Sequence, residues 1–283
     1  SREFPNAGPG HASWNHSLGR RLRRPSPPLV VLLHGGTQSM RAIFESGSGG
    51  TQAWPALAAE AGFVLLVPNG TTASGDTAGD DQNWNDCRRA GTAGPADTTA
   101  DDVGFVHALI DRGLETWAAD PKRVYVTGSS NGGMMTHRLA RELSDRIAAA
   151  ATFISNRPVD DECGAPGRPV PLLMVNGTAD PLMPFGGGSI GSNRGEVRSS
   201  DESRDWWLAV HGLSTAEPAV MSLPDLDPED GSRITVRWYG DDRQIGYAVV
   251  EGGGHTMPSR DHQIGRVAEA LVGQQNHDVE GAR

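Results

Sequence analysis

The sequence predicts an α/β fold in which a mostly parallel central sheet carries helices on both faces. Continuous apolar runs alternate with helical patterns along the chain, and this alternation is typical of buried parallel strands joined by crossover helices. No internal repeat and no linker divides the 283 residues, a length that can bury one large core. We expect an irregular or edge-strand lead-in over residues 1–28 and one domain over 29–283, without a large cap.

The expected elements follow from apolar runs and from turn signals. A glycine after the alanine-rich segment 54–61 indicates the end of a helix at Gly62. Apolar residues at helical spacing predict a helix over 100–117, and its acidic start suits the helix dipole. Strands are expected in 29–33, 63–67, 123–129, 148–155, 171–177 and 247–254, and further helices in 132–146, 201–212 and 264–274.

Composition excludes several classes of function. The net charge of −10 argues against a nucleic acid partner, which needs clustered basic residues. The one basic cluster, residues 20–24, is interpreted as a solvated surface segment. The longest apolar runs are too short to span a bilayer. Zinc, redox and nucleotide motifs are absent from the sequence, so we expect no metal and no cofactor. The two cysteines, taken alone, leave a disulfide and two free thiols equally open.

One serine has the sequence context of a nucleophile. The segment "GSSNG" (128–132) matches G-x-S-x-G around Ser130, with a predicted strand before it and a predicted helix after it. That context is the nucleophile elbow, a sharp turn between strand and helix. The same pattern also surrounds Ser189 in "GGSIG", where neither a strand nor a helix is expected. We therefore assign the role to Ser130, and neither to Ser189 nor to the adjacent Ser129.

An acid and a base follow Ser130 in the order that such a site requires. A serine hydroxyl needs a base to take its proton, and that base needs an orienting carboxylate. Asp180 follows the strand at 171–177, and His255 follows the strand at 247–254. Taken alone, each has a plain alternative as a turn aspartate or a loop histidine. Three residues in order on one alternating scaffold favour a Ser130–Asp180–His255 triad.

Other candidates are weaker. Asp101 and Asp102 are interpreted as acids at a helix start, and His107 and His137 as structural histidines within helices.

An oxyanion hole needs backbone N–H groups, which we expect from Asn131 and from the "HGGTQ" loop (34–38), at Gly36 or Thr37. An ordinary turn is the alternative for that loop.

These motifs resemble a known group of esterases. The segments "LLHGGTQ", "NWND", "ADDVGFVHALID", "DPKRVYVTGSSNGGMMTHRLA", "VNGTADPLMPFGGG" and "GGGHTMP" resemble those of the polyhydroxybutyrate depolymerase and feruloyl esterase group, in the same order, over roughly residues 29–260. The resemblance implies a single α/β-hydrolase domain that hydrolyses carboxylic esters without a cofactor. It also implies Ser130 as nucleophile, Asp180 as acid and His255 as base.

The resemblance carries further expectations. The two cysteines fall where the group often has cysteines, which favours a Cys87–Cys163 disulfide and an extracellular or periplasmic location, although no signal peptide is visible in this chain. Met257 stands where members usually have tryptophan, which indicates a different pocket wall. Residues expected to line the substrate pocket are Trp84, Asn85, Met183, Phe185 and Met257, with buried packing as the alternative for Trp84.

The expected substrate is a small or polymeric ester. The sequence favours feruloyl or short-chain esters as substrates. An aliphatic or aromatic polyester such as polyhydroxyalkanoate is the alternative. A binding module with an inactive triad is the alternative from a different class. The sequence leaves acyl and alcohol specificity and the oligomeric state open.

Overall fold

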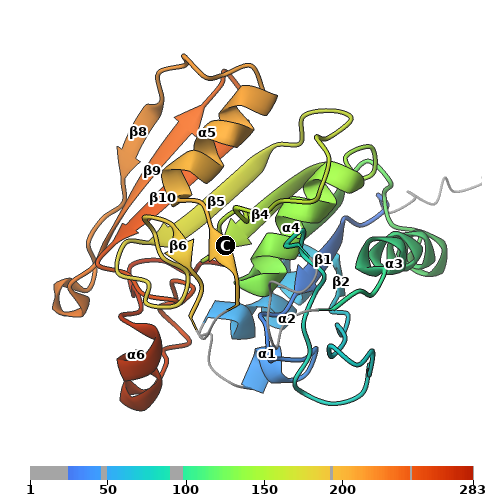
Figure 1. Ribbon diagram of the computed structural model, residues 1–283, viewed down its shortest axis with the longest axis horizontal. Coiled ribbons are helices and arrows are strands. Elements are labelled where there is room, and N and C mark those ends of the chain that lie inside the picture. Colours follow the sequence, from blue (N-terminus) through green and yellow to red (C-terminus); the bar gives the residue numbers. More distant parts are fainter. Residues whose placement is uncertain (1–24, 46–49, 90–97, 192–193, 243, 283) are drawn as a thin grey trace, which may run out of the picture.

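The fold is built around one twisted eight-stranded sheet. The computed structural model describes residues 25–45, 50–89, 98–191, 194–242 and 244–282. The strand order is β2-β1-β3-β4-β5-β10-β9-β8 (Figure 1). The six strands from β2 to β10 run parallel, whereas β9 and β8 are antiparallel additions at one edge. The strands are β1 (Leu29–Leu33), β2 (Val64–Leu66), β3 (Val124–Ser129), β4 (Ala149–Phe153), β5 (Leu172–Gly177), β8 (Ala219–Ser222), β9 (Arg233–Tyr239) and β10 (Ile245–Glu251).

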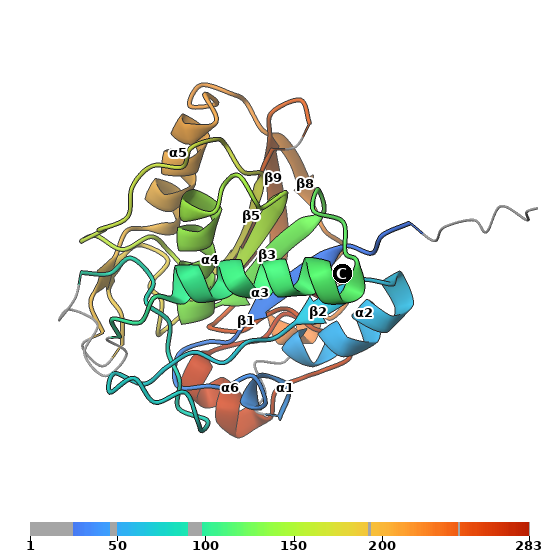
Figure 2. The same cartoon turned by 90° about the vertical axis from the view of Figure 1, so that its right-hand side faces the viewer.

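Helices cover both faces of this sheet. Apolar side chains of α3, α4 and α5 pack with alternate residues of the strands into the largest core cluster, and Figure 2 shows α4 and α5 on the opposite side of the sheet from α2. The smaller clusters on the other face include Trp54 at the start of α2. The helices are α1 (Ala42–Glu45), α2 (Trp54–Ala61), α3 (Asp102–Trp117), α4 (Asn131–Glu142), α5 (Ser200–Val210) and α6 (Arg266–Val272), with a 3-10 turn at Gly50–Ala53 before α2.

The mixed sheet with helices on both faces confirms the predicted α/β fold. Gly62 ends α2 in the left-handed conformation (φ 73°), as the sequence indicated. Strands β8 and β9 were not expected, and neither was the short helix α1. β8 is only four residues long and all four are exposed at the sheet edge, so its short run of apolar residues is a weak signal for a strand. Two further short strands, β6 (Gly188–Ser189) and β7 (Glu196–Val197), form a separate antiparallel pair.

Most of the predicted N-terminal lead-in, residues 1–24 of 1–28, lies outside the described residues. The boundary at residue 29 therefore stays a prediction. None of the helices that the structure describes is long and apolar enough to cross a membrane.

Candidate active site

Ser130 lies at the turn between β3 and α4. Its backbone adopts φ 55° and ψ −122°, a combination that is sparsely populated for residues with a side chain. Its N–H donates to the carbonyl oxygen of Phe153 at 2.9 Å, which ties the turn to β4. A β-carbon on Gly128 would lie 2.5 Å from the carbonyl oxygen of Gly132, and one on Gly132 would lie 2.3 Å from that of His34. Both glycines are therefore required by close backbone approach. The predicted elbow geometry is present at Ser130.

The predicted acid and base contact each other. Nδ1 of His255 lies 2.7 Å from Oδ2 of Asp180, and their side chains are 11% and 2% exposed. The other carboxylate oxygen of Asp180 accepts the N–H groups of Leu182 (2.8 Å) and Met183 (2.7 Å). These bonds fix the carboxylate, and the carboxylate fixes the imidazole ring. With Nδ1 held by Asp180, Nε2 is the ring nitrogen left to exchange a proton.

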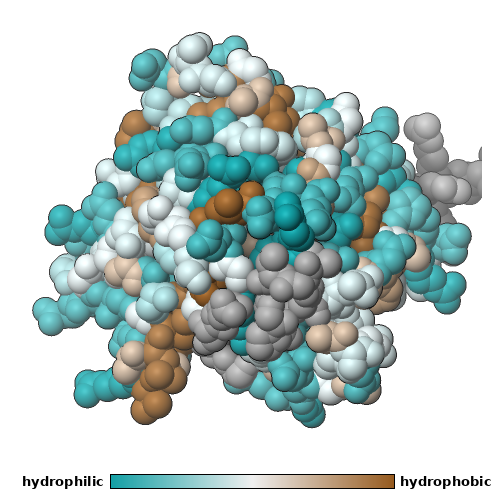
Figure 3. All heavy atoms as spheres, viewed as in Figure 1, coloured by the Kyte–Doolittle hydropathy of each residue, from teal (hydrophilic) through white to brown (hydrophobic). Residues whose placement is uncertain are grey.

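Ser130 and His255 line the same cleft. Its volume is about 480 Å³, and its walls come from the loop after β1, the elbow, the segment after Asp180, and α6. The side chain of Ser129 is buried, only 2% of that residue being exposed. On the far wall, α6 contributes Leu271, which is 71% exposed. Figure 3 shows an apolar patch at the place where Figure 1 draws α6. The cleft thus combines the predicted nucleophile, the predicted base and a partly apolar rim.

The loop after β1 carries the expected oxyanion donors. Nε2 of His34 accepts the N–H of Gly70 at 3.0 Å, so Nδ1 carries the proton and donates to the carbonyl oxygen of Gly35 at 2.7 Å. Burial lowers the pKa of His34 to about 4, which keeps this imidazole neutral. The N–H of Thr37 donates to Oδ1 of Asn83 at 3.2 Å, whereas the N–H of Gly36 has no acceptor among the described residues. Gly36 is therefore the better placed of the two predicted donors.

Trp84 and Asn85 are not among the described residues that line the cleft, and Trp84 has the buried packing that was the alternative for it. Trp84 is 1% exposed, and its Nε1 donates to the carbonyl oxygen of His34 at 2.9 Å. The backbone N–H of Asn85 donates to Asp102 at 2.8 Å and its side chain to the carbonyl oxygen of Ala100 at 3.0 Å. The "NWND" segment is thus a structural connection between the loop after β1, the elbow and the start of α3.

The other predicted pocket residues divide in two groups. Met183 lines the cleft. Phe185 instead packs against the largest core cluster, and Met257 is 1% exposed within a second core cluster. Neither residue is among the described residues that line the cleft, because both side chains pack with core clusters instead. The sequence alone does not tell an apolar residue of the core from one of the cleft.

The weaker candidates from the sequence lie outside the cleft, as far as the structure describes its lining. Ser189 lies in the exposed two-residue strand β6. Asp101 caps α3 by accepting the N–H of Gly104 at 2.9 Å, and burial raises the pKa of Asp102, the first residue of α3, to about 6. His137 is buried, and its Nδ1 accepts Nε1–H of Trp207 at 3.0 Å. Burial, with the nearby charges of two arginines, lowers its pKa to about 3.

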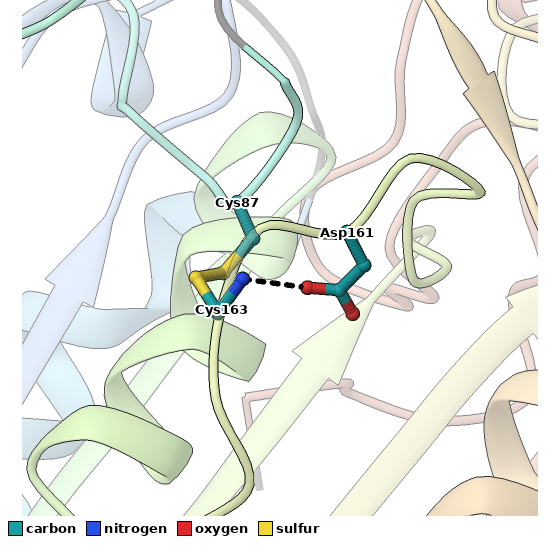
Figure 4. Close-up of side chains that lie close together, drawn as sticks. All are labelled: Cys87, Asp161 and Cys163. Carbon is teal, nitrogen blue, oxygen red and sulfur yellow. Dashed lines mark hydrogen bonds between the residues drawn. A yellow bond between two sulfur atoms is a disulfide. The ribbon is translucent and has the colours of Figure 1, made fainter.

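The expected disulfide is present. Cys87 and Cys163 are bonded, with a Cα–Cα distance of 5.4 Å (Figure 4). Asp161 accepts the N–H of Cys163 at 3.0 Å, and its carboxylate also pairs with Arg141 and Arg157 at 2.8 and 2.6 Å. Burial would raise the pKa of Asp161, but these two arginines and the N–H of Cys163 hold it below its ordinary value. The disulfide therefore anchors the "NWND" segment to a buried ionic cluster.

Three residues in or beside the site were not predicted from the sequence. Asp86 and Arg88 form an ion pair at 2.8 Å with side chains only 2% and 5% exposed. Asp86 also accepts from the side chain of Asn131 at 2.5 Å. A third residue, Arg194, lines the cleft. Two charged residues in a loop rich in polar residues gave no signal of burial, because nothing in the local pattern shows that they pair.

Sequence comparison relates the chain to known esterases. Residues 54–189 match the dienelactone hydrolase family. The chain is 30% identical over 180 residues to feruloyl esterase B of Piromyces equi, covering 62% of this chain and 31% of that protein. It is 25% identical over 236 residues to the poly(3-hydroxybutyrate) depolymerase of Ralstonia pickettii, covering 82% and 44%. The chain is thus similar in sequence to proteins named as a feruloyl esterase and a polyhydroxybutyrate depolymerase.

The fold agrees with this relationship. The solved structure of acetyl xylan esterase from Aspergillus awamori matches with a TM-score of 0.56 at 16% identity, covering 83% of this chain and 86% of that one. This likeness confirms the predicted α/β fold, and the sequence matches given above bear out the predicted resemblance to feruloyl esterases and polyhydroxybutyrate depolymerases. The chain spans less than half the length of the two curated relatives described above.

Proposed function

We propose that the protein is a serine carboxylesterase that acts through an acyl-enzyme. The observation that carries this proposal is that His255, held by Asp180, lines the same cleft as Ser130 at its elbow. Ser130 follows β3, Asp180 follows β5 and His255 follows β10, so all three lie beyond the carboxyl ends of parallel strands, where α/β folds hold their ligands. The curated relatives named as feruloyl esterases and depolymerases support the same reaction class.

The geometry assigns a role to each group. Nε2 of His255 takes the proton of Ser130 Oγ as that oxygen attacks the ester carbonyl carbon, and Asp180 stabilises the imidazolium that forms. The oxyanion receives hydrogen bonds from the N–H of Asn131 and the N–H of Gly36. His255 then gives its proton to the leaving alcohol. In the second step it activates a water molecule that releases the acid and regenerates Ser130.

The proposed substrates are feruloyl or short-chain esters. The cleft is small, at about 480 Å³, and its exposed rim residue Leu271 suits an apolar acyl or aromatic group. A polyester is the alternative, supported by the relative named as a depolymerase. Because disulfides persist in oxidising compartments, the Cys87–Cys163 bond supports an extracellular or periplasmic location.

Two measurements test this proposal. A fluorophosphonate probe should label one serine, and peptide mapping should place the label on the tryptic peptide that contains Ser130. Rates on methyl ferulate and on a hydroxybutyrate oligomer should then show which substrate class is preferred. A folded protein that neither reacts with the probe nor hydrolyses p-nitrophenyl acetate would instead be a binding module.

A further inference from the structure

Arg194 lies inside the proposed catalytic cleft. It lines the same cavity as Ser130 and His255. A β-carbon placed on Gly36 would lie 3.8 Å from Nη1 of Arg194, so this guanidinium adjoins the loop that carries the proposed oxyanion donor. An ester bound at Ser130 would therefore lie within reach of an arginine side chain.

The charge of Arg194 has no counter-ion among the residues that the structure describes. The described cleft lining contains neither aspartate nor glutamate, and His255 is its only other ionisable side chain. Arg194 takes part in no ion pair with a described residue, and its Nε is buried without an acceptor there. An unpaired cation that loses part of its hydration is costly. The chain has an excess of acidic residues, with a net charge of −10. None of those that the structure describes pairs with Arg194.

A buried network fixes the backbone of Arg194. Its carbonyl oxygen accepts Nη1–H of Arg88 at 2.5 Å, and Arg88 is held by its buried ion pair with Asp86. Asp86 in turn accepts from the side chain of Asn131, the residue after the nucleophile. The position of Arg194 is thus linked to the position of Ser130 through two intervening side chains and the amide of Asn131. Such support is expected for a group that positions a ligand.

We propose that Arg194 recognises a carboxylate carried by the ester substrate. This inference rests on the proposed esterase function and names a substrate class for the same cleft. Guanidinium binds a carboxylate through two parallel N–H···O bonds, which are stronger than neutral hydrogen bonds and sensitive to geometry. The protein is then selective for esters whose acyl or alcohol half bears a negative charge close to the scissile bond.

Matched ester pairs test this inference. In the acyl arm, mono-p-nitrophenyl succinate is compared with p-nitrophenyl valerate. In the alcohol arm, 4-acetoxybenzoate is compared with its methyl ester. Each is assayed with wild type, Arg194→Gln, Arg194→Lys and the control Arg112→Gln, which removes one positive charge from an exposed position of α3.

We expect wild type to prefer the anionic ester in at least one arm. Arg194→Gln should lower kcat/KM on that ester about tenfold or more, mainly through KM, and change the neutral ester less than about twofold. Arg194→Lys should recover part of the loss, since it keeps the charge without the planar fork. Arg112→Gln should match wild type, and added salt should weaken the preference.

Three results would overturn the inference. The first is a ratio of kcat/KM on the anionic ester to kcat/KM on the neutral ester that Arg194→Gln leaves unchanged in both arms. The second is an equal loss on charged and neutral esters, which would assign Arg194 to the general support of the cleft. The third is a wild type without preference for either anionic ester. Wild-type hydrolysis of the neutral esters separates these results from failure of the esterase proposal, which would abolish turnover of all four.

Discussion

Asn131 and Trp84 are joined by two hydrogen bonds: the side chain of Asn131 accepts the N–H of Trp84 at 2.7 Å and donates to its carbonyl oxygen at 3.0 Å. The residue that follows the proposed nucleophile is therefore hydrogen-bonded to the backbone of a segment 47 positions earlier in the chain. Since Trp84 also donates to the carbonyl oxygen of His34, the elbow and the loop after β1 are held in one geometry. That arrangement fixes where the two proposed oxyanion donors lie.

Replacing Asn131 with alanine should destabilise the protein strongly. The change keeps the backbone N–H but leaves the buried backbone groups of Trp84 without partners, so we expect the free energy of unfolding to fall by about 3 kcal/mol. Denaturant unfolding measures it. Asn85→Ala is the matched control, because that side chain amide bonds only the carbonyl oxygen of Ala100 among the described residues, and it should cost about 1 kcal/mol. Equal losses in the two variants would contradict this account.

The sequence predicted the triad because each member directly follows an apolar strand. It could not predict the strand order, since pairing between distant strands depends on contacts that no local pattern records. Trp84 was predicted to line the pocket because it is a large aromatic side chain in the "NWND" segment, one of those that carry the resemblance. It is core because its indole N–H finds a buried carbonyl. Arg194 was not predicted because it lies in a run of glycine and polar residues. Such a run is typical of an ordinary surface loop.

Loss of the disulfide should lower stability without removing the catalytic groups. The bond joins residues separated by 76 positions, so replacing both cysteines with serine should reduce the free energy of unfolding by about 4 kcal/mol. Comparison of urea midpoints for wild type and the double variant measures this loss. Wild type should also react with no thiol reagent before reduction. A double variant with the wild-type midpoint would show that the bond constrains little.

Acid should destabilise the protein through its buried histidines. The pKa of His137 is lowered to about 3 and that of His34 to about 4, so between these values and about 6.5 the unfolded chain binds more protons than the folded one. The stability contribution of each imidazole is therefore complete above about pH 6.5 and is lost as the pH falls. Well below pH 6.5 each adds a slope approaching 1.4 kcal/mol per pH unit.

His137→Asn isolates this effect. Its side chain oxygen can accept from Trp207 as Nδ1 of His137 does, but it does not titrate. Unfolding measured from pH 7 to pH 4.5 should show a shallower loss of stability in this variant than in wild type. His107→Asn, at a side chain that is 43% exposed, serves as the control. An unchanged slope in His137→Asn would contradict the proposed origin of acid sensitivity.

Asp180→Asn should reduce turnover with little effect on folding. An amide in place of the carboxylate no longer stabilises the imidazolium of His255, so kcat on p-nitrophenyl acetate should fall by about a thousandfold or more. Asp145→Asn, at an exposed aspartate after α4, should keep wild-type kcat. Near-normal turnover in Asp180→Asn would remove Asp180 from the triad.

The most direct test of the central claim compares the two adjacent serines at the elbow. Ser130→Ala and Ser129→Ala are assayed on p-nitrophenyl acetate, with folding of both confirmed by circular dichroism. Ser130→Ala should lose several orders of magnitude in kcat, whereas Ser129→Ala, which alters a buried neighbour, should retain much of the activity. A folded Ser130→Ala protein that keeps its activity, while Ser129→Ala loses it, would contradict Ser130 as the nucleophile.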